Sequence, residues 1–199
     1  MINLIDKNNK LSENKNSLVV TYPRTVHILF GNYPYPEKIH NFILEIKNNL
    51  SEKMEGYTNV KGGMTDWSYF IDKPSYKDFI SYVINKHQLS HPNIFEHFFE
   101  KYLLREAWGN EIKNNDSLDY HYHHHIHGIL YLTKGCDLNI PELNIRITPE
   151  PGDYYILPPY IQHGFEKHSG ESNRYCLVFN LHNNPLSHFD YNKKIEKMK

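Results

Sequence analysis

The chain has 199 residues, which is enough for one domain with a sizeable buried core. Its formal net charge is −1, so the composition offers no basic surface for nucleic acid. No window approaches the roughly 18 apolar residues of a membrane helix, and the N-terminus lacks the apolar segment of a secretory signal. We therefore expect a cytoplasmic protein, and two cysteines fit a reducing compartment better than a disulfide framework.

The chain begins with a polar stretch, residues 1–16, which we expect to be flexible. Residues 17–22 and 25–30 are rich in β-branched and aromatic side chains and are divided by Pro23, which predicts two short strands. A helix is expected from Pro36, because proline suits a first turn and apolar residues then recur at three- and four-residue steps.

Two further helices are predicted before the middle of the chain. The first is expected to begin after Ser75, with Asp78 three positions later as in a capping box. The second is expected after Pro92, with apolar residues as far as Leu103 on its buried face.

From residue 105 to residue 180 the pattern is strand-like, so helices are followed by a β half and the fold class is α+β. We expect a single domain in residues 17–184, in which 17–104 supply strands and supporting helices and 105–184 supply the core. Residues 185–199 are polar and lysine-rich and are expected to form a tail.

Five of the fourteen histidines fall within seven residues, 121–127. In a strand, residues two apart point to the same face, so His121 and His123 can reach one ion. His125 and His127 share that parity only if the strand continues, and we expect a turn before residue 128.

A third, remote ligand is needed to complete such a metal site, and His163 fits because it follows two prolines on a β segment. Two neighbouring ligands and one distant ligand, with open positions left, are typical of non-haem iron sites. The alternative interpretation of a histidine-rich patch is a solvated loop or a polar strand face.

Arg174 lies eleven positions after His163 and opens a β-prone segment whose alternation places Arg174 and Cys176 on one face. A buried arginine is costly unless it meets an anion, and its planar fork suits a carboxylate. The alternative is a surface arginine paired with Glu166 or Glu171.

This order of residues, His-x-His, a remote His, ten residues and then Arg, resembles the iron(II)- and 2-oxoglutarate-dependent oxygenases. The resemblance extends over roughly residues 64–181 to a small subfamily common in phage and marine bacterial genomes. The further motifs that carry it are Met64-Thr65-Asp66-Trp67, Ala107-Trp108-Gly109-Asn110, Gly128-Ile129-Leu130-Tyr131-Leu132, Pro151-Gly152-Asp153 with Leu157-Pro158, and Arg174 to Asn180.

The resemblance implies a double-stranded β-helix, or jelly roll, with the N-terminal helices packed on the sheet. It implies a dioxygenase that uses Fe(II), O2 and 2-oxoglutarate as cosubstrate, and that releases succinate as it hydroxylates a substrate. The substrate would be a small molecule or a peptide, with prolyl hydroxylation as the family-level analogy.

The resemblance also implies roles for individual residues. The implied iron ligands are His121, His123 and His163. Arg174 would bind the distal carboxylate of 2-oxoglutarate, aided by Tyr131 or Asn110.

One feature departs from the superfamily, most of whose members have Asp or Glu two residues after the first histidine. Here His123 stands at that position. His125 is held in reserve as a ligand, and Asp119, at strand parity with His121, is a fallback carboxylate.

Two other readings remain open from the sequence. One is a cupin-type metalloprotein without 2-oxoglutarate, although Arg174 would then have no role. The other is a non-catalytic module that binds zinc or nickel through its histidines.

The aromatic N-terminal half could cover the sheet or form a homodimer face.

Overall fold

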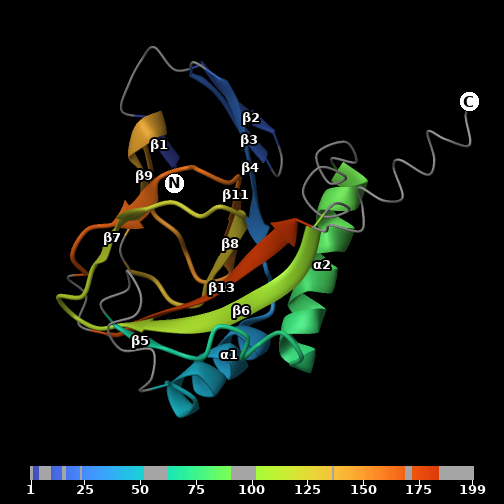
Figure 1. Cartoon of the computed structure of the whole chain (residues 1–199), viewed down its shortest axis with the longest axis vertical. Coiled ribbons are helices and arrows are strands. Elements are labelled where there is room, and N and C mark those ends of the chain that lie inside the picture. Colours follow the sequence, from blue (N-terminus) through green and yellow to red (C-terminus); the bar gives the residue numbers. More distant parts are fainter. Residues whose placement is uncertain are drawn as a thin grey trace, which may run out of the picture.

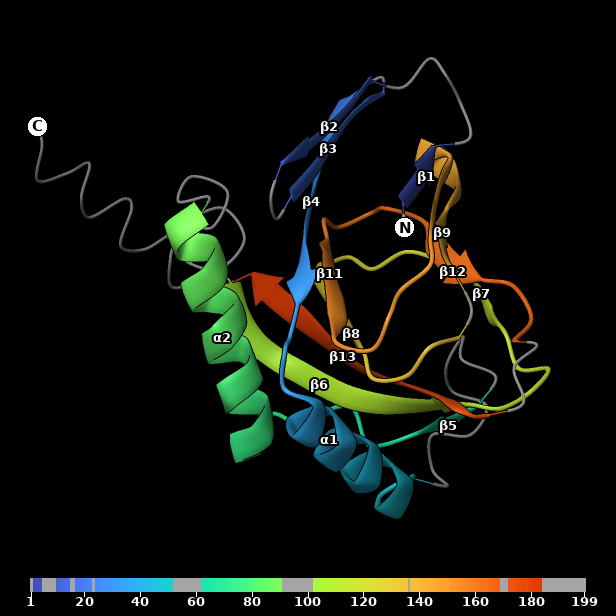
Figure 2. The same cartoon turned by 180° about the vertical axis from the view of Figure 1, so that it is seen from behind.

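The computed structural model describes residues 2–4, 10–14, 17–22, 24–51, 62–90, 102–135, 137–168 and 172–183. Within these ranges the chain forms three layers, which Figures 1 and 2 show from opposite sides. A five-stranded sheet faces an eight-stranded sheet, and two helices pack on the other face of the larger sheet. All the strand pairs are antiparallel.

The larger sheet carries most of the chain's β structure. In spatial order its strands are β2 (Lys10–Asn14), β3 (Ser17–Tyr22), β4 (Arg24–Asn32), β11 (Asp153–Leu157), β8 (Ile126–Tyr131), β13 (Arg174–Asn183), β6 (Tyr102–Ile112) and β5 (Gly63–Met64). The strands predicted at 17–22 and 25–30 are confirmed as β3 and β4, which pair with each other.

The smaller sheet has the order β1 (Ile2–Leu4), β10 (Ile145–Ile147), β9 (Leu138–Ile140), β12 (His163–Phe165) and β7 (Leu118–His121). A short 3-10 helix, η3 (Pro141–Leu143), joins β9 to β10. From β7 to β13 the chain passes back and forth between the two sheets, with only β9 and β10 consecutive in one sheet. Two facing antiparallel sheets linked in this way are compatible with a jelly roll.

The alternation of side chains along each central strand separates two apolar cores. In β11, Tyr154 and Ile156 belong to the core under the helices, whereas Tyr155 and Leu157 belong to the core between the sheets. The second core is the one that surrounds the pocket described below.

The helix predicted from Pro36 is confirmed as α1 (Pro36–Asn48), which buries Ile39, Phe42 and Ile46. It approaches the sheet closely at Gly109, where an added Cβ would lie 2.2 Å from Ile46 Cγ1. The second predicted helix is α2 (Pro74–Ser90).

The capping box predicted for this second helix is wrong. The helix already begins at Pro74, so Ser75 lies inside it, and the Ser75 hydroxyl donates to Glu45 Oε1 at 3.1 Å. Asp78 pairs with Lys38 of α1 instead of closing a capping box. The polar side chains that looked like a helix-start signal therefore join two helices.

The N-terminal third differs from the prediction in two ways. Residues 2–4 and 10–14 form strands where the sequence predicted no element. The first strand pairs with β10, far away in the chain, and the second pairs with β3, the next strand. The third predicted helix lies mostly outside the described residues, but its expected end at Leu103 is wrong. Residues 102 and 103 already belong to β6, where they pair with residues 183 and 182 of β13.

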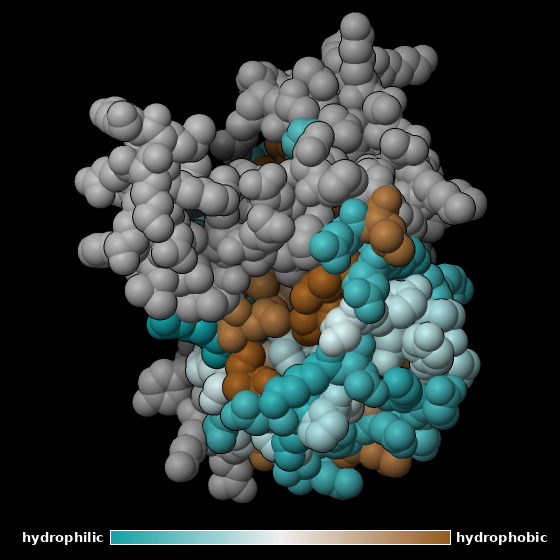
Figure 3. All heavy atoms as spheres, turned by 90° about the vertical axis from the view of Figure 1, so that its right-hand side faces the viewer, coloured by the Kyte–Doolittle hydropathy of each residue, from teal (hydrophilic) through white to brown (hydrophobic). Residues whose placement is uncertain are grey.

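Figure 3 shows the helix side of the molecule, where most of the coloured surface is hydrophilic and apolar residues are exposed in patches within it. Neither described helix combines the length and the apolar content needed to cross a bilayer.

Candidate metal centre

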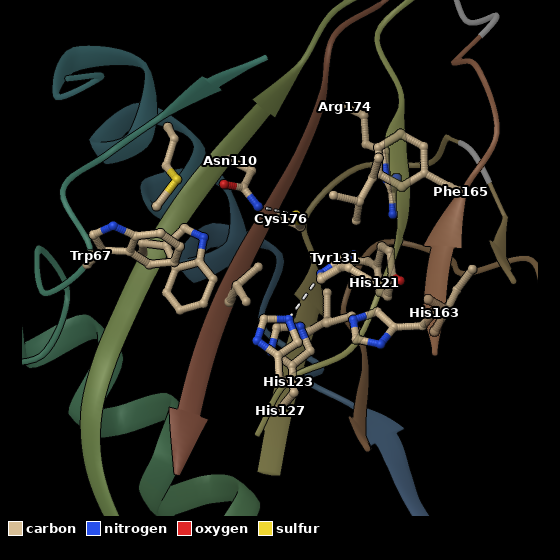
Figure 4. Close-up of a pocket in the computed structure, with 16 residues that line it drawn as sticks. Trp67, Asn110, His121, His123, His127, Tyr131, His163, Phe165, Arg174 and Cys176 are labelled. Atoms are coloured by element: carbon tan, nitrogen blue, oxygen red, sulfur yellow. Dashed lines mark hydrogen bonds between the residues drawn. The ribbon is translucent and has the colours of Figure 1, made fainter. Parts of the chain in front are cut away.

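A pocket opens between the two sheets, with a cavity of about 180 Å³. Most of its lining comes from β5, β6, β8 and β13 of the larger sheet and from β7, β9 and β12 of the smaller one, and two loops complete it. In Figure 4 the histidines gather at one end of this pocket, and Arg174 lies with Phe165 at the other. The pocket thus combines a nitrogen-rich end with a cationic end.

Three of the histidines predicted as ligands meet at the first end. His121 closes β7 and His163 opens β12, and the two residues are directly opposite in the paired strands. His123 lies two residues beyond His121 in the loop that follows β7. Each of the three offers one ring nitrogen, and these nitrogens all lie within 4.8 Å of one another.

The hydrogen bonds of two of these rings fix which nitrogen faces the pocket. His121 Nδ1 lies 2.9 Å from the Asp119 carbonyl oxygen, and His163 Nδ1 lies 3.0 Å from the Ile161 carbonyl oxygen. A carbonyl only accepts, so Nδ1 carries the proton in both rings, and Nε2 is left with a lone pair. This arrangement is the usual one around metal-binding histidines.

Two of the three nitrogens are spaced as one divalent ion requires. His121 Nε2 and His123 Nε2 lie 3.1 Å apart. Two nitrogens at about 2.1 Å from a common ion and about 90° apart at the ion would lie about 3.0 Å from each other. His163 Nε2 is buried and has no hydrogen-bond partner among the described residues. The three side chains therefore fit an ion held by imidazole.

Burial also keeps these imidazoles neutral, which metal binding requires. Desolvation, with smaller contributions from the neighbouring histidines, lowers the pKa of His123 to about 3. Desolvation and the proximity of His121 lower the pKa of His163 to about 4. Desolvation likewise lowers the pKa of His121, against a smaller opposing effect of its hydrogen bond to the backbone of Asp119.

The two reserve residues lie apart from this cluster. The His125 ring stacks on His182, with 3.8 Å between the ring centroids, and does not line the pocket. The Asp119 side chain is exposed, and its backbone oxygen accepts a hydrogen bond from His121. Neither offers an atom to the group of three.

His127 is a pocket residue whose position the sequence did not settle. The expected turn before residue 128 is present, but it occupies residues 122–125, so His127 already belongs to β8. It is buried and stacks on His123, with 3.8 Å between centroids and 11° between the ring planes. Complete burial lowers its pKa well below the usual value. Its parity with the apolar residues Ile129 and Tyr131 was the signal that could have placed it inward.

Arg174 lies at the far end of the pocket and is only 2% exposed, so it is a buried and not a surface arginine. Its guanidinium carbon is 4.8 Å from the Tyr131 ring centroid and 4.5 Å from that of Phe165. Gly135 leaves room for this side chain, because a Cβ there would lie 2.8 Å from Arg174 Cδ. Cys176 lines the same pocket, as the strand alternation predicted.

Asn110 and Tyr131, which the resemblance places beside the cosubstrate, also line the pocket. The Asn110 amide nitrogen lies 3.8 Å from Cys176 Sγ, while its carbonyl oxygen has no hydrogen-bond partner among the described residues. Tyr131 is buried between the sheets and supports the guanidinium of Arg174 through its ring.

Two tryptophans form an apolar wall of the pocket. Trp67 is 39% exposed, whereas Trp108 is buried, and their ring centroids lie 4.6 Å apart. The segment that carries Trp67 is docked on β6 through Thr65, whose backbone N–H donates to the Gly109 carbonyl and whose hydroxyl accepts from the Gly109 N–H, both at 3.0 Å. Two motifs that are distant in the sequence are thereby joined in one wall.

No protein-family model matches the chain, and no curated protein matches it. Solved structures do match. A viral collagen prolyl hydroxylase, vCPH, from Paramecium Bursaria Chlorella virus-1, solved as a 2OG complex, is 13% identical, with a TM-score of 0.61 over 77% of this chain and 94% of that chain. HygX from Streptomyces hygroscopicus, solved with nickel and 2-oxoglutarate, is 10% identical, with a TM-score of 0.59 over 79% and 83%.

A Pseudomonas putida prolyl-4-hydroxylase is 10% identical, with a TM-score of 0.58 over 79% of this chain and 92% of that chain. HygX has also been solved with iron bound. These structural neighbours are thus 2-oxoglutarate-dependent iron oxygenases, and the chain shares their fold. At such low identity the likeness concerns the fold, and the chemistry must be argued from the pocket itself.

Proposed function

We propose that this protein is an Fe(II)- and 2-oxoglutarate-dependent dioxygenase, and that its fold is the jelly roll of its structural neighbours. One observation carries the proposal: three inward-facing imidazoles and a buried guanidinium lie at opposite ends of one pocket. A metal chelated at one end and a carboxylate bound at the other match the two ends of a 2-oxo diacid.

In this proposal His121, His123 and His163 hold the iron through Nε2. Once bound, the iron and 2-oxoglutarate supply the activation of O2 and the hydroxylating chemistry, with release of succinate and CO2. The protein's own part is to keep three neutral ligands in place, to orient the cosubstrate and to exclude water.

Arg174 is the residue that orients the cosubstrate. Its guanidinium is desolvated, and its planar fork suits a carboxylate. The aromatic rings of Tyr131 and Phe165 pack against the guanidinium and support it. Asn110 lines the same cavity, and we propose that it contributes to the carboxylate site.

The wall formed by Trp67, Trp108 and Met64 is where we place the substrate. The described lining of the pocket contains Arg174 as a cation and no carboxylate, so the reacting part of the substrate is proposed to be uncharged. Prolyl residues in peptides satisfy this condition, and two of the structural neighbours are prolyl hydroxylases. Kinship with the phage and marine bacterial subfamily remains a proposal that rests on the sequence motifs.

The first test is an anaerobic titration of the Fe(II)-loaded protein with 2-oxoglutarate. We expect a weak metal-to-ligand charge-transfer band and, in air, slow production of succinate. A cupin-type protein would bind the metal without this band, and Arg174 would have no role in it. A sequestering module would prefer zinc and bind more than one ion. Absence of both band and succinate contradicts the proposal.

Variants separate the two ends of the pocket. His163→Gln should abolish stoichiometric metal binding, while His125→Gln, in the same histidine-rich region but outside the pocket, should leave it intact. Arg174→Ala should weaken 2-oxoglutarate by about 2–5 kcal/mol, the scale for truncating one partner of a buried charge pair. Arg146→Ala, at an exposed arginine of β10, is the matched control. Unchanged cosubstrate affinity in Arg174→Ala would remove this residue from the site.

A further inference from the structure

The three imidazoles of the candidate metal centre are not supported in the same way. His121 and His163 each donate Nδ1–H to a backbone carbonyl. The only hydrogen-bond contact of the His123 ring among the described residues is that of Nε2 with His121 Nε2, on the side where the ion would sit. Metal-binding histidines usually depend on a hydrogen bond from their second nitrogen to keep the ring oriented. His123 needs another support, because it lies in a loop.

That support is a flat contact with His127. The two rings are nearly parallel, at 11°, with their centroids 3.8 Å apart. His127 belongs to β8, a central strand of the larger sheet, so it is held far more rigidly than the loop. Figure 4 shows the two rings together at the histidine end of the pocket.

His127 is itself oriented by a polar row that crosses three paired strands. His127 in β8 is directly opposite Asn180 in β13, which is directly opposite Glu106 in β6. His127 Nδ1 lies 2.9 Å from Asn180 Oδ1, and Asn180 Nδ2 donates to Glu106 Oε2 at 2.7 Å. A carboxylate only accepts, so Glu106 fixes which end of the Asn180 amide faces His127. The amide oxygen in turn requires the proton of His127 to be on Nδ1.

We infer that His127 is a positioning residue, which holds the ring of His123 in place for the metal through a stack that Asn180 and Glu106 orient. This inference rests on the proposed function. The stack also explains how His123 can act as a ligand at the position where most members of the superfamily have Asp or Glu. A carboxylate has little surface to stack on, whereas a second imidazole can be clamped by a flat partner.

Metal binding tests the role without measuring turnover. Co(II) affinity and the visible spectrum of the Co(II) protein are recorded for wild type, His127→Leu and His127→Phe. His127→Leu removes the flat ring and should weaken Co(II) binding about 10- to 100-fold, the usual effect of losing an outer support of a ligand, and alter the spectrum. His127→Phe keeps a ring for the stack but cannot donate to Asn180, so it should recover part of the affinity that His127→Leu loses. His125→Gln is the control, because its ring also stacks on a histidine but outside the pocket.

Wild-type affinity in His127→Leu, or an equal loss in His127→Leu and His127→Phe, overturns the stacking role. Failure of His163→Gln to lose Co(II) would instead overturn the metal site and the proposed function with it, so the two failures are distinguishable. A second measurement needs no variant: imidazole nitrogen shifts by NMR of the Zn(II)-loaded wild type should show His127 protonated on Nδ1. Protonation on Nε2 would overturn the polar row.

Discussion

The buried histidines should make the metal-free protein sensitive to mild acid. Each histidine is charged below a pKa of about 6.5 in the unfolded chain. In the fold, burial lowers the pKa of His123 to about 3 and that of His163 to about 4. Between these values and 6.5 the unfolded state binds more protons than the native state, so stability falls as the pH falls. Stability is fully present above about pH 6.5.

The loss between pH 7.5 and 5.5 follows from these shifts. A histidine whose pKa drops from 6.5 to 4 or below loses about 1.3 kcal/mol over that interval. His123 and His163 together therefore account for about 3 kcal/mol. His127, whose pKa is lowered well below the usual value, acts in the same direction. Such a loss is a large part of the 5–15 kcal/mol by which domains are typically stable.

The assay is urea unfolding of the protein in EDTA at pH 7.5, 6.5 and 5.5, followed by circular dichroism. His163→Gln is measured beside it, because this variant lacks one of the titrating groups. Its loss of unfolding free energy between pH 7.5 and 5.5 should be smaller than that of wild type by about 1.3 kcal/mol. A wild-type stability that is flat or rises toward pH 5.5 would refute the reasoning.

Three further predictions concern packing and ligands. Gly128→Ala should destabilise the fold by about 1–3 kcal/mol, measured by urea unfolding, because the new Cβ would lie 2.0 Å from the Phe179 ring; wild-type stability would show that the ring can move. Gly135→Ala should weaken 2-oxoglutarate binding in calorimetry with little loss of metal affinity, because it displaces Arg174; equal losses of both would point to general misfolding. Free Co(II) at 100 times its dissociation constant should raise the unfolding free energy by about 2.7 kcal/mol, and no rise would mean that the ion binds the unfolded chain equally well.

The sequence was most informative where local pattern and tertiary structure agree. The strand alternation placed Arg174 and Cys176 on one face, and both line the pocket. The spacing from His121 to His123, with His163 far away in the chain, predicted three rings that meet in the structure. The paired strands β7 and β12 bring two of them together, and the loop after β7 brings the third.

The remaining features depend on partners that no local pattern contains. Ser75 resembled a helix cap, yet its hydroxyl contacts Glu45 of another helix. The inward position of His127 depended on where the turn fell, and its hydrogen bond to Asn180 joins residues 53 positions apart. The strand pairing of residues 102 and 103 with β13 overrode a helical pattern in the same way.

Both tryptophans of the chain belong to the wall of the pocket. One is partly accessible and the other is enclosed, and they touch edge to face. The tryptophan fluorescence of this protein, excited at wavelengths that tyrosine does not absorb, therefore originates at the wall where we place the substrate. The molecule carries its own optical reporter, with which candidate substrates can be screened unlabelled before any product is known.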